Sequence, residues 1–295
     1  MIVHSFLHQD SKTFSHLLVA NPDSDKQVCA VIDPVLDFNA NSGSTSTQSI
    51  DQIIAMIGAK NLQLEFIMET HAHADHLSGA SYLKQSLGGK IVIGKQITQV
   101  QKIFKQIYNL DTSFRTDASQ FDVLLEDGDT LTLGNITINA MAVPGHTPAD
   151  LAYLATDNHK QVAFIGDTLF APDVGTARCD FPGGDAATLF DSIQKLLSLP
   201  EDTTLYLCHD YPPNDRPACP TSSVSEQKQH NIHVKQGVTK QQFVEMREAR
   251  DRTLDMPQLI IPSVQVNIAA GNLPNPEENG IRYLKLPLNA FGKNS

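Results

Sequence analysis

The sequence lacks the marks of membrane, secreted and nucleic-acid-binding proteins. No apolar run approaches the roughly 18 residues of a transmembrane helix, so we expect no membrane span. The beginning, MIVHSFLHQD, has no basic segment followed by a long apolar stretch, which argues against a secretory signal and favours a cytoplasmic location. Acidic residues outnumber basic ones by 33 to 22, and the net charge of −11 argues against general nucleic-acid binding.

Cysteine is scarce, and its four positions show no CxxC spacing: Cys29, Cys179, Cys208 and Cys219. In an intracellular protein this pattern predicts reduced, partly buried side chains. Cys179 is expected to be structural, because nothing in the sequence indicates an adjacent base that would lower its pKa.

The composition is that of a folded chain with a substantial core. Hydrophobic residues make up 41%, charged residues 19%, and the mean hydropathy is −0.20, which argues against disorder. A length of 295 residues suits one large α/β domain. With no internal repeat or low-complexity linker, we predict a single domain over 1–295, with a C-terminal helical and tail extension from about residue 222.

Strand-like runs alternate with helical patterns along the chain. Strands are expected at 16–20, 27–33, 64–70, 90–94 and 204–210, with a hairpin turning at Gly134-Asn135. Helices are expected at 49–59 with Ser49 as N-cap, and at 76–89, 97–110, 187–199 and 239–254. Residues 38–47 predict a polar loop, and a Pro- and Asn-rich tail follows the last helix. This layout suits two sheets packed face to face with helices outside.

Residues 69–79, ETHAHADHLSG, place three histidines and an aspartate within six positions. They follow a strand-like run, and alternate residues of an extended segment point to one side, so His71 and His73 can converge. Asp75 and His76 fall where a helix would begin and can reach the same cavity. Three more residues of ligand type follow other strands: His146, Asp167 and His209. Because loops at strand ends are held by a rigid scaffold, the seven residues predict a metal centre.

The ligand types leave the metal open. Histidine and carboxylate suit zinc, iron, manganese and nickel. All seven positions could hold two ions, as in hydrolases that bridge a hydroxide between metals. Two histidines and one carboxylate would instead leave open positions on a single Fe(II), as in non-haem oxygenases.

Four motifs resemble those of the metallo-β-lactamase superfamily: THAHADH (70–76), PGHTP (144–148), GDTLF (166–170) and CHDY (208–211). The resemblance spans nearly the whole chain. It implies an α/β fold, the αββα sandwich of two mixed β-sheets face to face with helices outside. Within the superfamily, GTARCDFPGGDA (175–186) is similar to a segment of the persulfide dioxygenases, also called sulfur dioxygenases or ETHE1-like proteins. DPVLDF and the following SGSTST resemble their bacterial branch.

This second resemblance implies one Fe(II) per chain, held by His71, His146 and Asp167. The other ligand-type residues would line the cavity and bond to metal-bound waters, or hold a second ion: His73, Asp75, His76 and His209. The implied reaction is oxidation of glutathione persulfide by O2 to sulfite and glutathione. Zinc, the alternative metal, has no accessible redox change and cannot activate O2. The implied partners are the small-molecule persulfide and O2, and the family also implies a homodimer.

Glutathione carries two carboxylates, so its site needs cationic or hydroxyl partners. Arg178, within the 175–186 segment, is one candidate, although it equally suits a structural ion pair with Asp180. Tyr211 and Arg216 are the other two. The charged helix 239–254 is expected to present a solvated face, although three of its arginines could edge the substrate cleft: Arg247, Arg250 and Arg252.

Two other functions compete with this one. A dinuclear zinc thioester hydrolase of the glyoxalase II type shares HxHxDH, a PGHT-like segment and GDTLF. HDY in place of the usual HEY, and a tail, IIPSVQVNIAAGNLPNP, unlike that family's substrate-binding domain, count against it. A non-catalytic persulfide- or metal-binding module is the second alternative, and the complete set of ligand residues counts against that.

Overall fold

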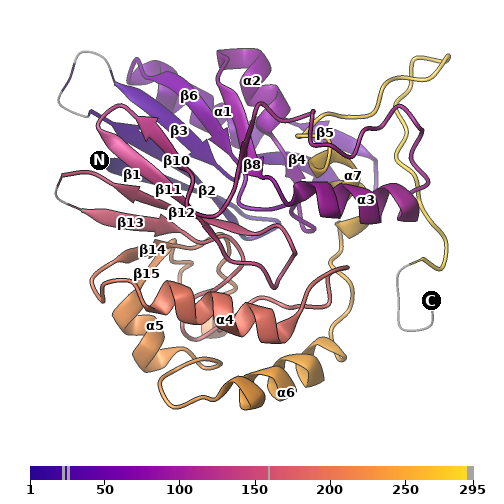
Figure 1. Cartoon of the computed structure of the whole chain (residues 1–295). Helices are drawn as coiled ribbons and strands as arrows, with labels where there is room; N and C mark the ends of the chain where they lie inside the picture. The colour runs from indigo at the N-terminus through magenta and orange to yellow at the C-terminus, as the bar shows by residue number, and fades with distance from the viewer. Residues whose placement is uncertain (22–23, 25–26, 159, 291–295) are drawn as a thin grey trace.

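Two six-stranded sheets face each other, and helices cover their outer sides (Figure 1). The computed structural model of the chain describes residues 1–21, 24, 27–158 and 160–290. The strand order is β1-β2-β3-β6-β8-β9 in the first sheet and β10-β11-β12-β13-β14-β15 in the second. The predicted αββα sandwich is therefore confirmed.

The first sheet consists of β1 (Ile2–His8), β2 (Thr13–Ala20), β3 (Val28–Ile32), β6 (Gln63–Met68), β8 (Lys90–Gly94) and β9 (Val123–Leu125). Strands β1 to β3 pair antiparallel, and β3, β6, β8 and β9 pair parallel. Its outer face is covered by α1 (Gln48–Ala59), α2 (Ala80–Leu87) and α3 (Ile97–Ile107). The side chains of β2 alternate between two cores. Leu17 and Val19 pack on these helices, while Leu18 faces the second sheet.

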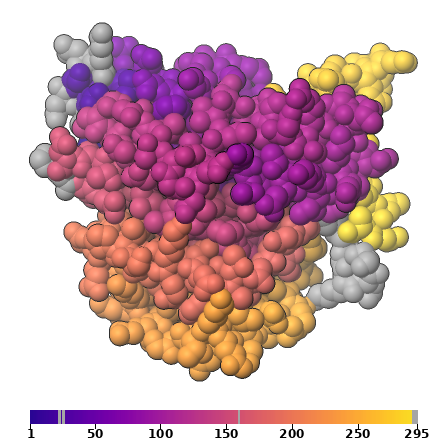
Figure 2. All heavy atoms as spheres, viewed as in Figure 1, coloured from indigo at the N-terminus to yellow at the C-terminus, as the bar shows by residue number. Residues whose placement is uncertain are grey.

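The second sheet consists of β10 (Thr130–Leu133), β11 (Ile136–Ala142), β12 (Leu151–Thr156), β13 (Gln161–Phe164), β14 (Thr204–Tyr206) and β15 (Thr221–Ser223). All neighbours pair antiparallel except β13 and β14, which are joined through a helix. The expected hairpin at Gly134-Asn135 is confirmed by the β10–β11 pairing. Helices α4 (Ala186–Leu197), α5 (Val224–His230) and α6 (Lys240–Asp251) cover this half, and orange α6 lies along its lower side (Figure 2).

A small third sheet replaces the polar loop predicted for 38–47. It contains β4 (Val35–Asn39), β5 (Ser44–Ser46) and β7 (Leu77–Ser78). The prediction of Ser49 as N-cap was also wrong, because α1 begins after Thr47. The N–H and hydroxyl of Ser49 both donate to the carboxylate of Asp37, which ties α1 to β4. Helix α2 likewise begins at Ala80 rather than at His76, which leaves the histidine-rich segment as a loop.

Part of the predicted C-terminal tail is a helix, α7 (Ile260–Asn267). Pro262 lies in its first turn, where the backbone has no need of an N–H donor, so the proline does not interrupt it. Ile260, Val264 and Ile268 are buried in the core on the outer side of the first sheet. Strand β15, which spans the predicted start of the extension near 222, belongs to the second sheet. Within the described ranges, none of the helices has the length and apolar character to cross a bilayer.

Gly145 lies in the loop between β11 and His146, and α4 packs closely against it. Its φ is +140°, and an added Cβ would lie 2.4 Å from the backbone of Leu189 in α4. Because backbone atoms cannot move aside, Gly145→Ala is expected to lower the free energy of unfolding by about 2–4 kcal/mol, as measured by urea denaturation. Gly58→Ala in α1, where nothing lies within 4 Å, is the control and is expected to stabilise the protein by about 0.5–1 kcal/mol. Unchanged stability of G145A would contradict the packing described.

Candidate metal centre

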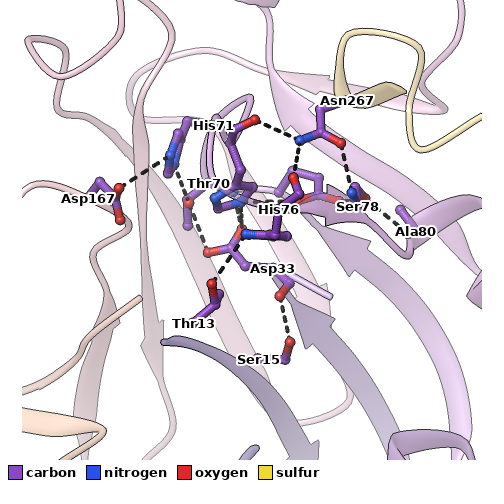
Figure 3. A network of polar contacts seen from close by, with 12 residues as sticks. Thr13, Ser15, Asp33, Thr70, His71, His76, Ser78, Ala80, Asp167 and Asn267 are labelled. Carbon is purple, nitrogen blue, oxygen red and sulfur yellow. Dashed lines mark hydrogen bonds and ion pairs between the residues drawn. The ribbon is translucent and has the colours of Figure 1, made fainter. Parts of the chain in front are cut away.

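The loops that follow four strands bring all the predicted ligand residues to one edge of the sandwich. The residues from these loops are His71, His73, Asp75 and His76 after β6, His146 after β11, Asp167 after β13, and His209 after β14. All are buried except Asp75, which is partly exposed. Figure 3 shows His71 and Asp167 pointing toward one another from different segments of the chain. The structure thus assembles residues that are far apart in sequence into one polar cluster.

Asp167 is the residue that several histidines share. Its Oδ2 lies 3.8 Å from His71 Nε2 and 3.6 Å from His146 Nε2. Its Oδ1 lies 3.3 Å from His209 Nε2, which is itself 3.4 Å from Asp75 Oδ2. Donor atoms at about 2.1 Å from a tetrahedral ion lie about 3.4 Å from one another. These spacings therefore suit atoms that surround metal ions.

Unpartnered buried atoms test whether a metal fits here. Among the described residues, five donor or acceptor atoms of the cluster are buried without a hydrogen bond: His71 Nε2, His73 Nδ1, His76 Nε2, Asp167 Oδ1 and His209 Nε2. Leaving one such atom unsatisfied costs about 1–3 kcal/mol, so five in one place need an explanation. Coordination supplies it, because imidazole nitrogen and carboxylate oxygen are ligands for zinc and iron alike. The residues present fit a metal ion, and its identity stays open.

Asp33, at the end of β3, orients two of the histidines from below (Figure 3). Its carboxylate accepts from the N–H and hydroxyl of Thr70, at 2.7 and 2.9 Å. With its proton donated to Asp33, the Thr70 oxygen accepts from His71 Nδ1 at 3.0 Å. His73 Nε2 donates to Asp33 at 3.1 Å. Each ring therefore keeps its other nitrogen free for a metal.

Backbone carbonyls fix two further rings. His146 Nδ1 donates to the carbonyl of Arg178 at 2.7 Å, which leaves Nε2 directed at Asp167. His209 Nδ1 donates to the carbonyl of Lys12 at 3.3 Å and likewise keeps Nε2 free. The bond from His146 to Arg178 joins a ligand-type histidine to the 175–186 segment. These bonds set the tautomers that metal binding requires.

Burial and neighbouring charges act in opposite directions on the histidines. Burial lowers the pKa of His76 to about 4 and holds the pKa of His71 well below its usual value, so both rings are neutral. Burial would also lower the pKa of His73 and His209, but Asp33 raises the first, and Asp167 with Asp75 raises the second. Since a ligand imidazole must be deprotonated, metal binding here displaces protons and weakens as the pH falls.

Asn267, the last residue of α7, was missed in the sequence. Its Nδ2 donates to the carbonyls of His73 and His76, both at 2.8 Å, and its Oδ1 accepts from Ser78 N at 2.7 Å (Figure 3). One side chain thus holds three backbone groups of the histidine-rich loop. Asp33 and Thr70, which orient the rings of His71 and His73, were also missed. The one signal for the role of Asp33 was its position at the end of the predicted strand 27–33.

The three predicted substrate residues have different surroundings. Tyr211 lines the cavity next to the centre and stacks on His209, with ring centroids 5.6 Å apart. Arg178 also lines it, but its guanidinium pairs with Asp180 and donates to the carbonyl of Asp255. The guanidinium of Arg216 is bound by two carboxylates, Asp173 and Asp210, and Arg216 is not among the residues that line the cavity. Carboxylates therefore hold both guanidinium groups in this structure, and the substrate roles of Arg178 and Arg216 stay predictions.

The family described as "Metallo-beta-lactamase superfamily" matches residues 21–209. The chain belongs to this superfamily, as its motifs predicted. Among solved structures, ETHE1 from Myxococcus xanthus superposes with a TM-score of 0.72 at 27% identity, covering 92% of this chain and 100% of that one.

Curated relatives have several names. "Probable metallo-hydrolase" of Burkholderia pseudomallei is 53% identical and covers 99% of this chain and 100% of that protein. "Glyoxylase B2" of Dictyostelium discoideum is 50% identical and covers 90% and 91%. Human "Persulfide dioxygenase ETHE1, mitochondrial" is 32% identical over 202 residues, which are 68% of this chain and 65% of that protein. The persulfide dioxygenases are thus among the more distant relatives of this chain.

Asn267→Ala removes the three bonds between α7 and the histidine-rich loop. We expect zinc affinity to fall about 10- to 100-fold, because residues that orient ligands have effects of this size. Competition with a chromophoric chelator measures the change on the metal-free protein. Asn279→Ala is the control, since Asn279 is exposed and, among the described residues, its side chain bonds to Ile281 N and Tyr283 Oη. Equal zinc affinity of N267A and N279A would disprove the clamping role.

Proposed function

We propose that the chain is a glutathione-dependent persulfide dioxygenase that oxidises glutathione persulfide with O2 and water to sulfite and glutathione at a mononuclear Fe(II) centre. The observation that carries this proposal is the buried group of His71, His146 and Asp167, whose ligand atoms all lie within 4.8 Å of one another. Two histidines and one carboxylate are the donor set that leaves open positions on Fe(II) in non-haem oxygenases.

The segment that resembles persulfide dioxygenases contacts this group directly. Its Arg178 carbonyl accepts the bond from His146, and its Cys179 N–H donates to Asp251 of α6 at 2.8 Å. The segment therefore connects a ligand-type histidine to the helix that lines the cavity. Similarity to human persulfide dioxygenase and full coverage of the Myxococcus xanthus ETHE1 structure support the same function.

The chain's own residues supply ligand orientation and a place for the substrate. When bound, Fe(II) would supply redox chemistry between O2 and the soft anionic sulfur of the persulfide. Zinc cannot supply it, because zinc has no accessible redox change. A cavity of about 840 Å³ opens from His146 and Asp167, with Phe170 and Tyr211 on its wall. Cavities of roughly 300–1,000 Å³ take ligands of drug size, so the volume suits a tripeptide persulfide. A cytoplasmic location stays part of this proposal.

A dinuclear zinc thioester hydrolase of the glyoxalase II type is the second candidate. A specific observation favours it: further ligand-type residues have unpartnered atoms beside the first group, namely His73, His76 and His209, with the carboxylate of Asp75 among them. The 50% identity to Glyoxylase B2 of Dictyostelium discoideum supports it as well. The two candidates differ in the number of ions and in the need for O2.

Anaerobic metal analysis and an O2 electrode distinguish the candidates. Protein reconstituted with one Fe(II) per chain is expected to consume O2 with glutathione persulfide and release sulfite, and zinc-loaded protein is not. Asp167→Ala is expected to lower the rate by at least about 100-fold, because it removes one of three metal donors. His76→Ala is expected to retain it within about 10-fold, since the proposed single ion does not use that residue. The hydrolase would be established instead by two zinc ions per chain, thioester hydrolysis and no O2 uptake. Metal binding without turnover would establish a binding module.

A further inference from the structure

The cavity extends well beyond the metal-binding residues. Its outer wall includes Arg247 and Arg250 of α6, and Leu254, Pro257 and Leu259 from the segment between α6 and α7. A persulfide group and O2 fill only a small part of about 840 Å³. The outer part is therefore available to the thiol carrier of the substrate, and its wall decides which carrier fits.

Over the whole cavity, carboxylates outnumber permanent cations by four to three. Four aspartates line the cavity: Asp10, Asp75, Asp167 and Asp173. Among the described lining residues, three arginines and no lysine supply permanent positive charge: Arg178, Arg247 and Arg250. In a chain of net charge −11, an anionic carrier needs a cation that is free to pair with it.

Two of the three arginines already have anionic partners. The guanidinium of Arg178 binds the carboxylate of Asp180 through two nitrogens. Arg247 is buried, donates to Asp251 at 2.6 and 2.9 Å, and also donates to the carbonyl of Thr176. Arg250 differs from both, because its exposed guanidinium has no hydrogen bond or ion pair with any described residue.

The helix that carries Arg250 is held in place close to the metal centre. Arg247 bonds to Thr176, and Asp251 accepts from Cys179, so α6 is attached on both sides of Arg250 to the 175–186 segment. That segment in turn bonds to His146 through Arg178. A cation presented by such a fixed helix has a defined place relative to the reacting end of the substrate.

We propose that Arg250 binds a carboxylate of the substrate's thiol carrier and so selects peptide-like, anionic persulfides over uncharged ones. This inference rests on the proposed function, since it assigns the carrier-binding residue of the same site. Planar guanidinium and carboxylate groups pair through two parallel bonds, which gives direction as well as attraction. Arg250 is a binding residue in this assignment and takes no part in the oxidation.

Arg250→Gln tests the assignment by steady-state O2 uptake with two substrates. With glutathione persulfide, the KM of R250Q is expected to rise about 10- to 50-fold with little change in kcat, because a charge-assisted pair is lost from binding. With the persulfide of N-acetylcysteamine, which has no carboxylate, R250Q and the parent are expected to have the same KM. Arg250→Lys is expected to restore part of the affinity.

Arg252→Gln is the matched control. Arg252 lies two residues further along, is exposed, pairs with Glu248 at 3.9 Å, and is not among the cavity-lining residues. Its variant is expected to keep the parent KM for both substrates. Equal KM values of R250Q and the parent for glutathione persulfide would overturn the assignment, as would an equal rise for both persulfides.

Calorimetric titration with S-methylglutathione separates failure of this inference from failure of the proposed function. The Fe(II)-loaded parent is expected to bind this inert probe, and R250Q to bind it about 10-fold or more weakly. If the parent binds the probe through Arg250 but consumes no O2, the dioxygenase proposal fails and the carrier site stands. If the parent does not bind the probe, or R250Q binds it equally well, the carrier site is refuted.

Discussion

The carboxylate of Asp33 is buried at the end of β3, directly beneath the histidine-rich loop. A buried charge is costly unless it is fully hydrogen-bonded, and here Thr70 and His73 supply three donors. Burial alone would raise the pKa of the Asp33 carboxyl, but the charge and bonds of His73 and the bonds of Thr70 lower it. The group stays ionised, and that charge holds one histidine directly and a second through Thr70. This interaction therefore orients two of the ligand-type histidines, His71 and His73.

The sandwich makes this arrangement possible because its strands end at a common edge. Parallel pairing of β3 with β6 places Asp33 beside Thr70, and parallel pairing of β13 with β14 places Asp167 near His209. The two sheets then bring these pairs together across a shared apolar core. Five unpartnered atoms at the edge lower the stability of the metal-free protein. Coordination restores that free energy, so metal binding and stability are linked.

Features encoded locally could be predicted from the sequence, and features made by distant contacts could not. HxHxDH could be interpreted as part of a metal centre, because an extended segment places alternate side chains on one side. The β10–β11 hairpin could be predicted because Gly134-Asn135 is a turn signal. The β4–β5 hairpin was missed because its Ser, Thr, Asn and Gly composition is typical of loops. The carboxylates around Arg216 come from residues six and 43 positions away, so its structural role had no local signal. The number of metal ions could not be predicted, because the chain contains more than one possible donor group. One is His71, His146 and Asp167, and another is His73, Asp75 and His76.

The C-terminal helices complete the site rather than merely follow the fold. Residues 21–209 match the superfamily, yet α6 and α7 lie after them and bond to loops of the centre. Asn267 of α7 holds the loop that carries His73 and His76, and Asp251 of α6 holds the segment that orients His146. The same α6 provides the outer wall of the cavity. Within α6, Asp251 therefore supports ligand orientation, and the neighbouring Arg250 is the residue proposed to bind the thiol carrier, so one short helix combines two separable roles.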